Sequence, residues 1–394
     1  MTRGSRVRRS APRERAPALT AGTGEPPPDG AAPPDDVAAY LRRTADSGAG
    51  HGRWRRPRGR AVVAAGLPVA AIALLLTVAA SLLIGSGDVS AAAVWHAVAP
   101  FGGSYDPADK AQLIVREVRV PRTLAGVLAG VALGLAGAVM QGVTRNPLAD
   151  PGLLGVNSGA SVAVVLSMSV FGLTEPGQYV WFGLLGALFA AALVHGVGAL
   201  GPAGATPVKL ALAGAATSAV LGSLTTAVLL TDDETFEQFR FWQVGALTAR
   251  ETGVLWQVAP LLAVGVCCAL LLGPRLNALA LGDDLARGLG QRVGAARAGA
   301  VAAVVLLAGG ATVVAGPIGF VGLVVPHAAR LLTGPDYRWI LPYSALLAPV
   351  LLLLADLAGR LIAWPGEVQA GIVTAAIGAV PFVALVRRRK TAEL

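Results

Sequence analysis

Charged residues are scarce in this chain of 394 residues. They make up 14% of it, whereas a soluble globular protein carries about 25%. Hydrophobic residues make up 54%, and the mean hydropathy is +0.63. This composition excludes an ordinary soluble domain. It predicts an all-α polytopic membrane protein, because the apolar runs are about as long as a helix needs to cross the hydrocarbon.

Lysine is equally rare, and the chain has only Lys110, Lys209 and Lys390. None of them follows a glycine, so the chain lacks the Gly-Lys-Ser/Thr of a P-loop, in which backbone amides and the lysine hold phosphates. We therefore do not expect it to bind ATP itself. The four histidines are scattered, and no His, Cys or carboxylate group has metal-ligand spacing. We expect no cofactor, no metal site and no catalytic residues.

Cysteine is almost absent, and the two cysteines, Cys267 and Cys268, are neighbours in an apolar run. Neighbouring residues on a helix point in different directions, so a disulfide between these two is not expected. We interpret both as small buried hydrophobic residues.

The formal net charge of +9 is concentrated at the ends of the chain. Most of the excess lies in residues 1–60 and in the basic run 387–390, and both flank hydrophobic spans. This placement follows the positive-inside rule, puts both termini in the cytoplasm and argues against nucleic-acid binding. Residues 1–58 are rich in Pro, Gly, Ala and Arg and predict a disordered tail. Residues 59–394 predict the transmembrane domain.

Apolar runs predict about ten transmembrane helices. They cover about 61–84, 122–143, 154–172, 179–200, 208–230, 254–272, 298–314, 318–332, 340–357 and 371–386. Two further segments, 89–99 and 241–247, predict short helices at the membrane surface. Arginines gather in the loops predicted on the inner side, and the outer loop 231–251 has more acids than bases, which supports the same orientation.

The most specific stretch runs from Arg119 to Ser161. It begins with Arg-Val-Pro-Arg, carries Gly126, Gly130 and Gly134 on one helix face, and ends in Arg-Asn-Pro-Leu-Ala-Asp-Pro. Glycine at every fourth position lets a neighbouring helix approach closely. Together these features resemble the signature of the FecCD-type permeases, the membrane subunits of ABC importers for iron-siderophores, haem and vitamin B12.

The resemblance covers about residues 65–390. It implies the type II ABC importer permease fold, in the cytoplasmic membrane, for a transport subunit rather than an enzyme. It also implies three kinds of protein partner: ABC ATPase subunits, an extracytoplasmic substrate-binding protein, and a second permease subunit that is identical or homologous. An iron-siderophore is the expected cargo, with vitamin B12 or haem as alternatives.

Candidate site residues follow from the same resemblance. Arg119, Arg122 and Arg360, at the outer ends of spans, are expected to dock the binding protein, with lipid anchoring or internal pairing as the alternative. The inner loop between the sixth and seventh spans resembles the coupling helices that fit a cleft on the ATPase. Its residues in that role are Leu281, Gly282, Asp283, Asp284, Ala286, Arg287, Leu289 and Gly290.

Two more groups complete the expectation. The fifth span has a mild polar face that, with the tenth, is expected to line the translocation path: Thr217, Ser218, Ser223, Thr225 and Thr226. Residues that match family motifs are expected to have structural roles: Gly126, Gly130, Gly134, Gln141, Asn146, Pro147, Gly316, Pro317, Pro326, His327 and Asp356. Asp356 precedes Arg360 by four residues, so the two face each other on a helix.

The chain departs from the family pattern at two positions. Gln369 replaces a proline, and Pro381 lies one place later than usual. Two rival functions are less well supported. A secondary transporter would carry ionisable groups in mid-membrane for coupling, and the predicted spans have almost none. An intramembrane enzyme would need a nucleophile–base pair or a metal constellation, and we find neither.

Overall fold

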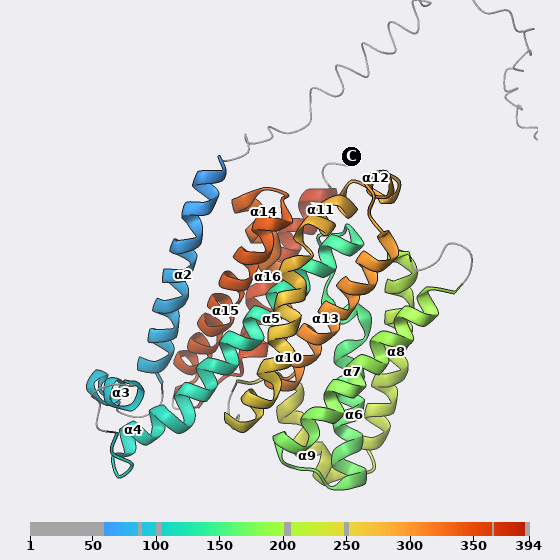
Figure 1. The fold of residues 1–394 in the computed structure, drawn as a ribbon. Helices are drawn as coiled ribbons and strands as arrows, with labels where there is room; N and C mark the ends of the chain where they lie inside the picture. The colour runs from blue at the N-terminus through green and yellow to red at the C-terminus, as the bar shows by residue number, and fades with distance from the viewer. Residues whose placement is uncertain are drawn as a thin grey trace, which may run out of the picture. The chain divides into compact units, whose positions relative to one another are not determined.

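The computed structural model describes residues 59–85, 89–99, 105–200, 206–247, 252–364 and 366–390, and all of them lie in helices or in the turns between helices (Figure 1). No strand occurs within these ranges. The tail expected over residues 1–58 lies outside the described residues, as does the end of the chain after Lys390.

Within the described residues, seven helical runs are long and apolar enough to cross a membrane. They are α2 (Arg60–Leu83), the continuous run of α4 (Lys110–Ile114), η1 (Val115–Arg119) and α5 (Val120–Thr144), then α7 (Pro176–Gly198), α8 (Pro207–Leu229), α10 (Thr252–Leu271), α13 (Val293–Ala315) and α15 (Tyr337–Ile362). Three apolar helices are shorter: α6 (Val156–Phe171), α14 (Val321–Thr333) and α16 (Ala370–Lys390), which is apolar over Ala370–Val380. Each of the ten apolar runs in the sequence coincides with one of these ten helices.

The remaining helices are short and lie at the two ends of the bundle. Helices α11 (Gly273–Ala280) and α12 (Asp283–Gly288) lie together at one end, here called the α12 end (Figure 1). Helices α3 (Ala91–Val98) and α9 (Asp233–Gln243) lie at the opposite end, the α9 end. The 3-10 helix η2 (Pro151–Leu154) joins α5 to α6.

Helix α5 is the centre of the bundle. Of the apolar window of its run, 78% is buried, against 17% for α2, which packs at the side on α15 and α5. Small residues make this burial possible. A Cβ atom added at Gly130 would lie 2.4 Å from the Pro349 Cα on α15, and one at Gly137 would lie 1.9 Å from the Gly322 carbonyl oxygen on α14. On α5, Gly126, Gly130 and Gly134 therefore place bare backbone against α15, and Gly137 places it against α14.

Helix α6 follows a turn that interrupts the helical path after α5. Arg145 ends α5 in the left-handed region (φ 53°), and Gly155 repeats that conformation (φ 71°) before α6. A Cβ at Gly155 would lie 3.8 Å from the hydroxyl of Ser218, near the middle of α8. Helix α6 therefore begins about halfway along α8.

The cysteine interpretation is wrong in one respect. Cys267 and Cys268 form no disulfide, as expected, but both are exposed on the surface of α10. Their thiols face outward from the bundle because α10 buries mainly the face that carries Val258, Leu262 and Gly265.

Candidate functional site

The loop from Leu281 to Gly290, here called the α12 loop, protrudes at the α12 end. Two glycines with positive φ shape it, Gly282 (108°) and Gly290 (78°), and no atom lies within 4 Å of a Cβ added at either. Such φ values are open to glycine and strained for other residues. The two glycines therefore serve the path of the backbone rather than close packing.

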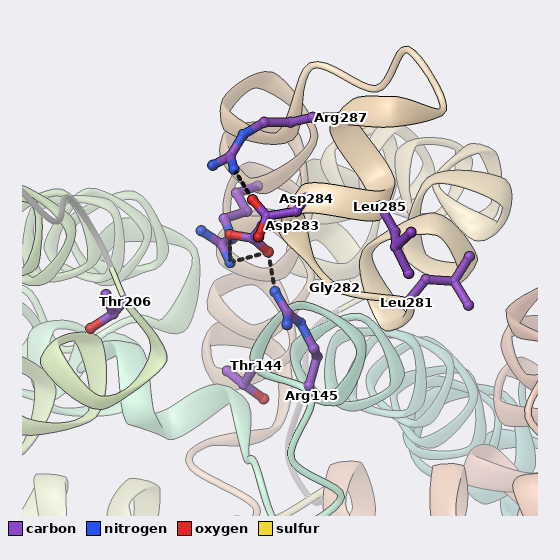
Figure 2. Close-up of a pocket in the computed structure, with 10 residues that line it drawn as sticks. Thr144, Arg145, Thr206, Leu281, Gly282, Asp283, Asp284, Leu285 and Arg287 are labelled. Atoms are coloured by element: carbon purple, nitrogen blue, oxygen red, sulfur yellow. Dashed lines mark hydrogen bonds and ion pairs between the residues drawn. The ribbon is translucent and has the colours of Figure 1, made fainter. Parts of the chain in front are cut away.

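Asp283 anchors the α12 loop to the bundle. Its carboxylate accepts hydrogen bonds from Arg145, the residue that follows α5, and from Arg297 on α13, with 3.0 Å to the latter. Arg145, Asp283, Asp284 and Arg287 line an open hollow of 630 Å³ (Figure 2). One carboxylate thus joins the α12 loop to the end of α5 and the start of α13.

The other side of the α12 loop is apolar and unusually exposed. Leu281, Leu285 and Leu289 are 59%, 62% and 65% exposed, while Ala286 beneath them is fully buried. Figure 2 shows Leu281 and Leu285 close together, on the side away from Asp283 and Asp284. Three exposed leucines on one short segment form a surface that a protein partner would cover.

A second hollow, here called the polar pocket, has a volume of 690 Å³. Three walls come from α6, α8 and α9, and Pro317 completes the lining. The described lining residues carry no charge: they are Asn157, Ser158, Ser161, Gly222, Thr225, Thr226, Leu229, Leu230, Phe236, Gln243 and Pro317. Its size lies within the range of small-molecule sites, about 300–1,000 Å³.

The hydroxyl groups on α8 are partly satisfied by their own helix. Thr225 donates to the Leu221 carbonyl (2.9 Å) and Thr226 to the Gly222 carbonyl (3.0 Å). Each therefore presents acceptor lone pairs to the pocket. Asn157 is held differently, because Thr312 on α13 donates to its Oδ1 at 2.9 Å.

The structure brings only part of the expected path together. Thr225 and Thr226 line the polar pocket, whereas Thr217 is buried, Ser218 packs near Gly155, and Ser223 lies on the exposed side of α8. The sequence reasoning missed the contribution of α6 and α9. The sequence does hold a signal for α6, because three polar residues lie near the start of the span expected over 154–172: Asn157, Ser158 and Ser161.

Helix α9 owes its position at the pocket to a side-chain cap. Asp232 accepts hydrogen bonds from the Thr235 N–H (3.0 Å) and hydroxyl (2.6 Å). These bonds hold the pKa of the Asp232 carboxyl below its usual value. The cap is therefore ionised at neutral pH and keeps the first turn of α9 in place beside the pocket.

The three outer arginines are buried and paired within the chain, which matches the internal pairing that the sequence left open as an alternative. Arg119, Arg122 and Arg360 are 3%, 5% and 3% exposed. Arg122 donates to the fully buried Asp356 (2.7 Å) and to Glu367 (2.7 Å), which is 28% exposed. We call these five residues the arginine cluster.

The buried arginines also find hydrogen-bond acceptors in the backbone carbonyls at the end of α2. Arg119 donates to the Leu82 and Leu83 carbonyls (2.8 and 2.9 Å), and Arg360 donates to those of Ser81 and Ile84 (3.0 and 2.9 Å). The last carbonyls of a helix have no partner in that helix, so α2 needs such donors. Arg360 also pairs with Asp356, as their spacing predicted. The cluster therefore ties α2, α5, α15 and the segment before α16 together.

The other motif residues lie at helix contacts and turns. Gln141 is buried on α5 and donates to the Gly322 and Leu323 carbonyls (3.3 and 3.1 Å). Asn146 accepts from the Leu148 N–H (3.0 Å) in the turn that contains Pro147. A Cβ at Gly316 would lie 2.3 Å from the Trp242 carbonyl oxygen. Pro326 and His327 lie within α14, before the chain turns back.

Comparison with known proteins agrees with this architecture. The model of the FecCD transport family matches residues 73–388. The ferric enterobactin transport system permease protein FepD of Escherichia coli is 46% identical over 330 residues, covering 84% of this chain and 96% of FepD. The probable siderophore transport system permease protein YfiZ of Bacillus subtilis is 41% identical over 315 residues, covering 80% of this chain and 93% of YfiZ.

A solved structure is similar in fold. It is described as an inward-facing conformation of a metal-chelate type ABC transporter, with a TM-score of 0.71, 27% identity, and coverage of 82% of this chain and 98% of the other. The family model matches most of the chain, and the permease relatives are similar to it over about four fifths of its length. These two findings decide the classification. This chain, a transport permease rather than an enzyme, belongs to the FecCD transport family.

Proposed function

We propose that this protein is a permease subunit of a binding-protein-dependent ABC importer that takes up an iron-siderophore chelate through the cytoplasmic membrane. The observation that carries the proposal is the pairing of two features. An exposed, leucine-tipped α12 loop lies at one end, and an uncharged polar pocket large enough for a small chelate lies among α6, α8 and α9. A permease that contains no ATPase of its own needs a surface that binds the separate ATPase subunit and a pocket that admits the transported chelate.

The cargo class is inferred from the relatives together with the pocket. FepD is named for ferric enterobactin, and other permeases at 40–41% identity are named for iron(3+)-hydroxamate and Fe(3+)-citrate import. The pocket has no carboxylate, thiolate or imidazole among its described lining residues, so it suits a chelate rather than a bare metal ion. A hemin permease of Yersinia pestis is 36% identical, and haem, with vitamin B12, remains the alternative cargo.

The arrangement of the importer follows from the same proposal. All ten apolar helices cross the membrane, both termini are cytoplasmic, and the α12 end faces the cytoplasm. Two permease subunits, identical or homologous, enclose a central path lined by α8 and α16. Two ATPase subunits bind at the α12 end and drive the switch between inward- and outward-facing states.

We also propose that the binding protein docks at the α9 end, near the arginine cluster. Arg122 is held on one side by buried Asp356 and on the other by the more exposed Glu367. A partner carboxylate would reach Arg122 most directly by taking the place of Glu367. Charge at such a contact mainly sets the rate of encounter and the register of docking.

A reconstitution experiment tests the proposal as a whole. The chain is co-purified with its ATPase and binding protein, placed in vesicles, and supplied with iron-55 as a ferric trihydroxamate and as a ferric tricatecholate. We expect nucleotide-dependent accumulation of at least one chelate, and loss of that accumulation when the Walker lysine of the ATPase is replaced. Accumulation by the permease alone, with no nucleotide, would overturn the proposal in favour of a secondary transporter.

The two positive-φ glycines of the α12 loop give a prediction about coupling. Replacing Gly282 or Gly290 with valine should lower uptake per ATP hydrolysed by about five- to tenfold, because a side chain forced into the left-handed region costs roughly 1–2 kcal/mol. Gly288 is the matched control: it lies in α12, its φ is not positive, and no atom lies within 4 Å of an added Cβ. Gly288→Ala should leave coupling unchanged. Equal uptake in all three variants would contradict the coupling role.

A further inference from the structure

Helix α13 connects the two candidate sites directly. It begins at Val293, just after the α12 loop, and Arg297 in its first turns pairs with Asp283 of that loop at 3.0 Å. Near its other end, Thr312 donates to Asn157 in the polar pocket at 2.9 Å. Fifteen residues separate Arg297 from Thr312, about 22 Å of α-helix. The same helix therefore holds a residue of each site.

The hydroxyl of Thr312 behaves unlike most threonine hydroxyls in the described helices. A buried threonine on a helix commonly donates to the carbonyl four residues earlier. Six threonines in the described helices do so: Thr77, Thr123, Thr144, Thr225, Thr226 and Thr333. Thr312 is 1% exposed and donates across to α6 instead. Its proton is used to hold another side chain rather than its own helix.

The bond decides which face Asn157 presents to the pocket. An asparagine amide offers an oxygen acceptor and an NH₂ donor. Because Oδ1 accepts from Thr312, the NH₂ group is left as the donor of this side chain. The pocket contains no described charged residue, so an amide donor there suits the uncharged or delocalised oxygen atoms on the periphery of a metal chelate.

Helix α13 is packed closely against its neighbours along its length. Of its apolar window, 72% is buried, and it packs against α5, α7 and α10. Gly309 and Gly310 allow close contact on two sides: an added Cβ would lie 3.2 Å from Ala187 and 2.5 Å from Leu262. A packed helix of this kind moves as a unit, since close-packed interiors transmit strain.

We propose that Thr312 is a positioning residue that orients the Asn157 amide toward the chelate in the polar pocket, and that α13 carries movement of the α12 loop to Asn157 through this hydrogen bond. The inference rests on the proposed function, because it assigns the α12 loop to the ATPase and the pocket to the cargo. The inference adds that α13 connects the α12 loop to the polar pocket. It also adds that Thr312 decides which atom of the Asn157 amide is free to bind the chelate.

The transport test compares Thr312→Val, which keeps the shape but removes the hydroxyl, with Thr312→Ser, which keeps the hydroxyl. In the reconstituted importer, with the ferric chelate that the unaltered protein accumulates, we expect Thr312→Val to lower uptake per ATP hydrolysed about fivefold. ATP hydrolysis should stay within about twofold, and Thr312→Ser should restore uptake. Thr77→Val is the matched control, since it removes a buried helix hydroxyl from α2, away from both sites.

Two results of that test would overturn the inference. Uptake per ATP unchanged in Thr312→Val would show that the bond does not matter. An equal defect in Thr312→Val and Thr312→Ser would show that keeping the hydroxyl does not preserve uptake, so the hydrogen bond is not what Thr312 provides. Failure of the unaltered importer to accumulate any chelate is a different outcome, because it removes the proposed function itself.

A second measurement needs only the permease. In a Cys267→Ser, Cys268→Ser background, Ser161→Cys places one thiol in the pocket, and its rate of reaction with a maleimide reports pocket geometry. Gly290→Val, which alters the α12 loop, should change this rate severalfold when Thr312 is present. The change should disappear when Thr312→Val is added. A rate that does not respond to Gly290→Val, or that responds equally in both backgrounds, would overturn the inference.

Discussion

Replacing Asp356 with alanine is expected to prevent accumulation of stable, folded protein. The carboxylate is fully buried and accepts from both Arg122 and Arg360, whose side chains are 5% and 3% exposed. Removing it leaves two guanidinium groups buried without their shared counter-charge. Breaking a buried ion pair from one side costs about 3–5 kcal/mol, a large part of the roughly 5–15 kcal/mol that holds a typical protein folded.

Thermal unfolding in detergent, followed by size-exclusion chromatography, measures this effect. Glu237→Gln is the matched control, because its pair with Arg240 is exposed on α9 (57% and 48%) and such pairs contribute about 0–1 kcal/mol. The triple change Asp356→Leu, Arg122→Leu and Arg360→Leu should recover part of the loss, since replacing a buried carboxylate together with both of its arginine partners by apolar residues is often tolerated. An Asp356→Ala protein as stable as the unaltered one would refute the structural role of the cluster.

Enlarging Gly137 should be almost as damaging. A Cβ atom there would lie 1.9 Å from the Gly322 carbonyl oxygen and 2.5 Å from the Gly322 Cα, and these are backbone atoms that no side-chain rotation can move. Gly137→Ala therefore forces α5 and α14 apart. We expect a loss of about 3 kcal/mol, at the upper end of the usual cost of overpacking, and lower yield of folded protein.

Gly299→Ala serves as the control for the same measurement. Gly299 lies within α13, and no atom lies within 4 Å of an added Cβ. Alanine is the better helix former, so this change should leave stability unchanged or raise it by up to about 1 kcal/mol. If Gly137→Ala and Gly299→Ala unfolded at the same temperature, the close approach of α5 and α14 would not be what glycine provides.

Helix positions could be predicted because they depend on local apolar runs. The run at 179–200 corresponds to α7 (Pro176–Gly198), and the run at 254–272 to α10 (Thr252–Leu271). Helix α15 (Tyr337–Ile362) is longer than the 340–357 expected from hydropathy. Hydropathy ends the span at Leu357, next to Asp356, but the helix continues to Ile362, where the Asp356–Arg360 pair lies buried inside the protein.

Contacts between distant parts of the chain could not be predicted in the same way. The Asp356–Arg360 pair is visible in the sequence because it obeys helical spacing. Arg122 joins that pair from 234 residues away, and no local pattern reports it. The sequence therefore left internal pairing of these arginines as an alternative and could not name Arg122 as the partner of Asp356.

Only the α8 side of the polar pocket could be predicted, because the α6 side depends on contacts between distant parts of the chain. Thr225 and Thr226 are visible as a polar face on an otherwise apolar span. The contribution of Asn157 depends on α6 beginning about halfway along α8, which follows from the turns at Arg145 and Gly155. Hydropathy indicates where a span lies in the sequence but not how deep in the bundle its first residue sits.

The burial of the arginine cluster has a practical consequence for biochemistry at high ionic strength. At about 1 M salt, interactions between exposed charges are screened beyond roughly 3 Å, whereas buried pairs are screened much less. The Asp284–Arg287 pair on the α12 loop is exposed (101% and 60%), while Asp356 is sealed from solvent. A strong salt wash should thus weaken the electrostatic contacts that the exposed α12 loop makes while leaving the buried arginine cluster intact.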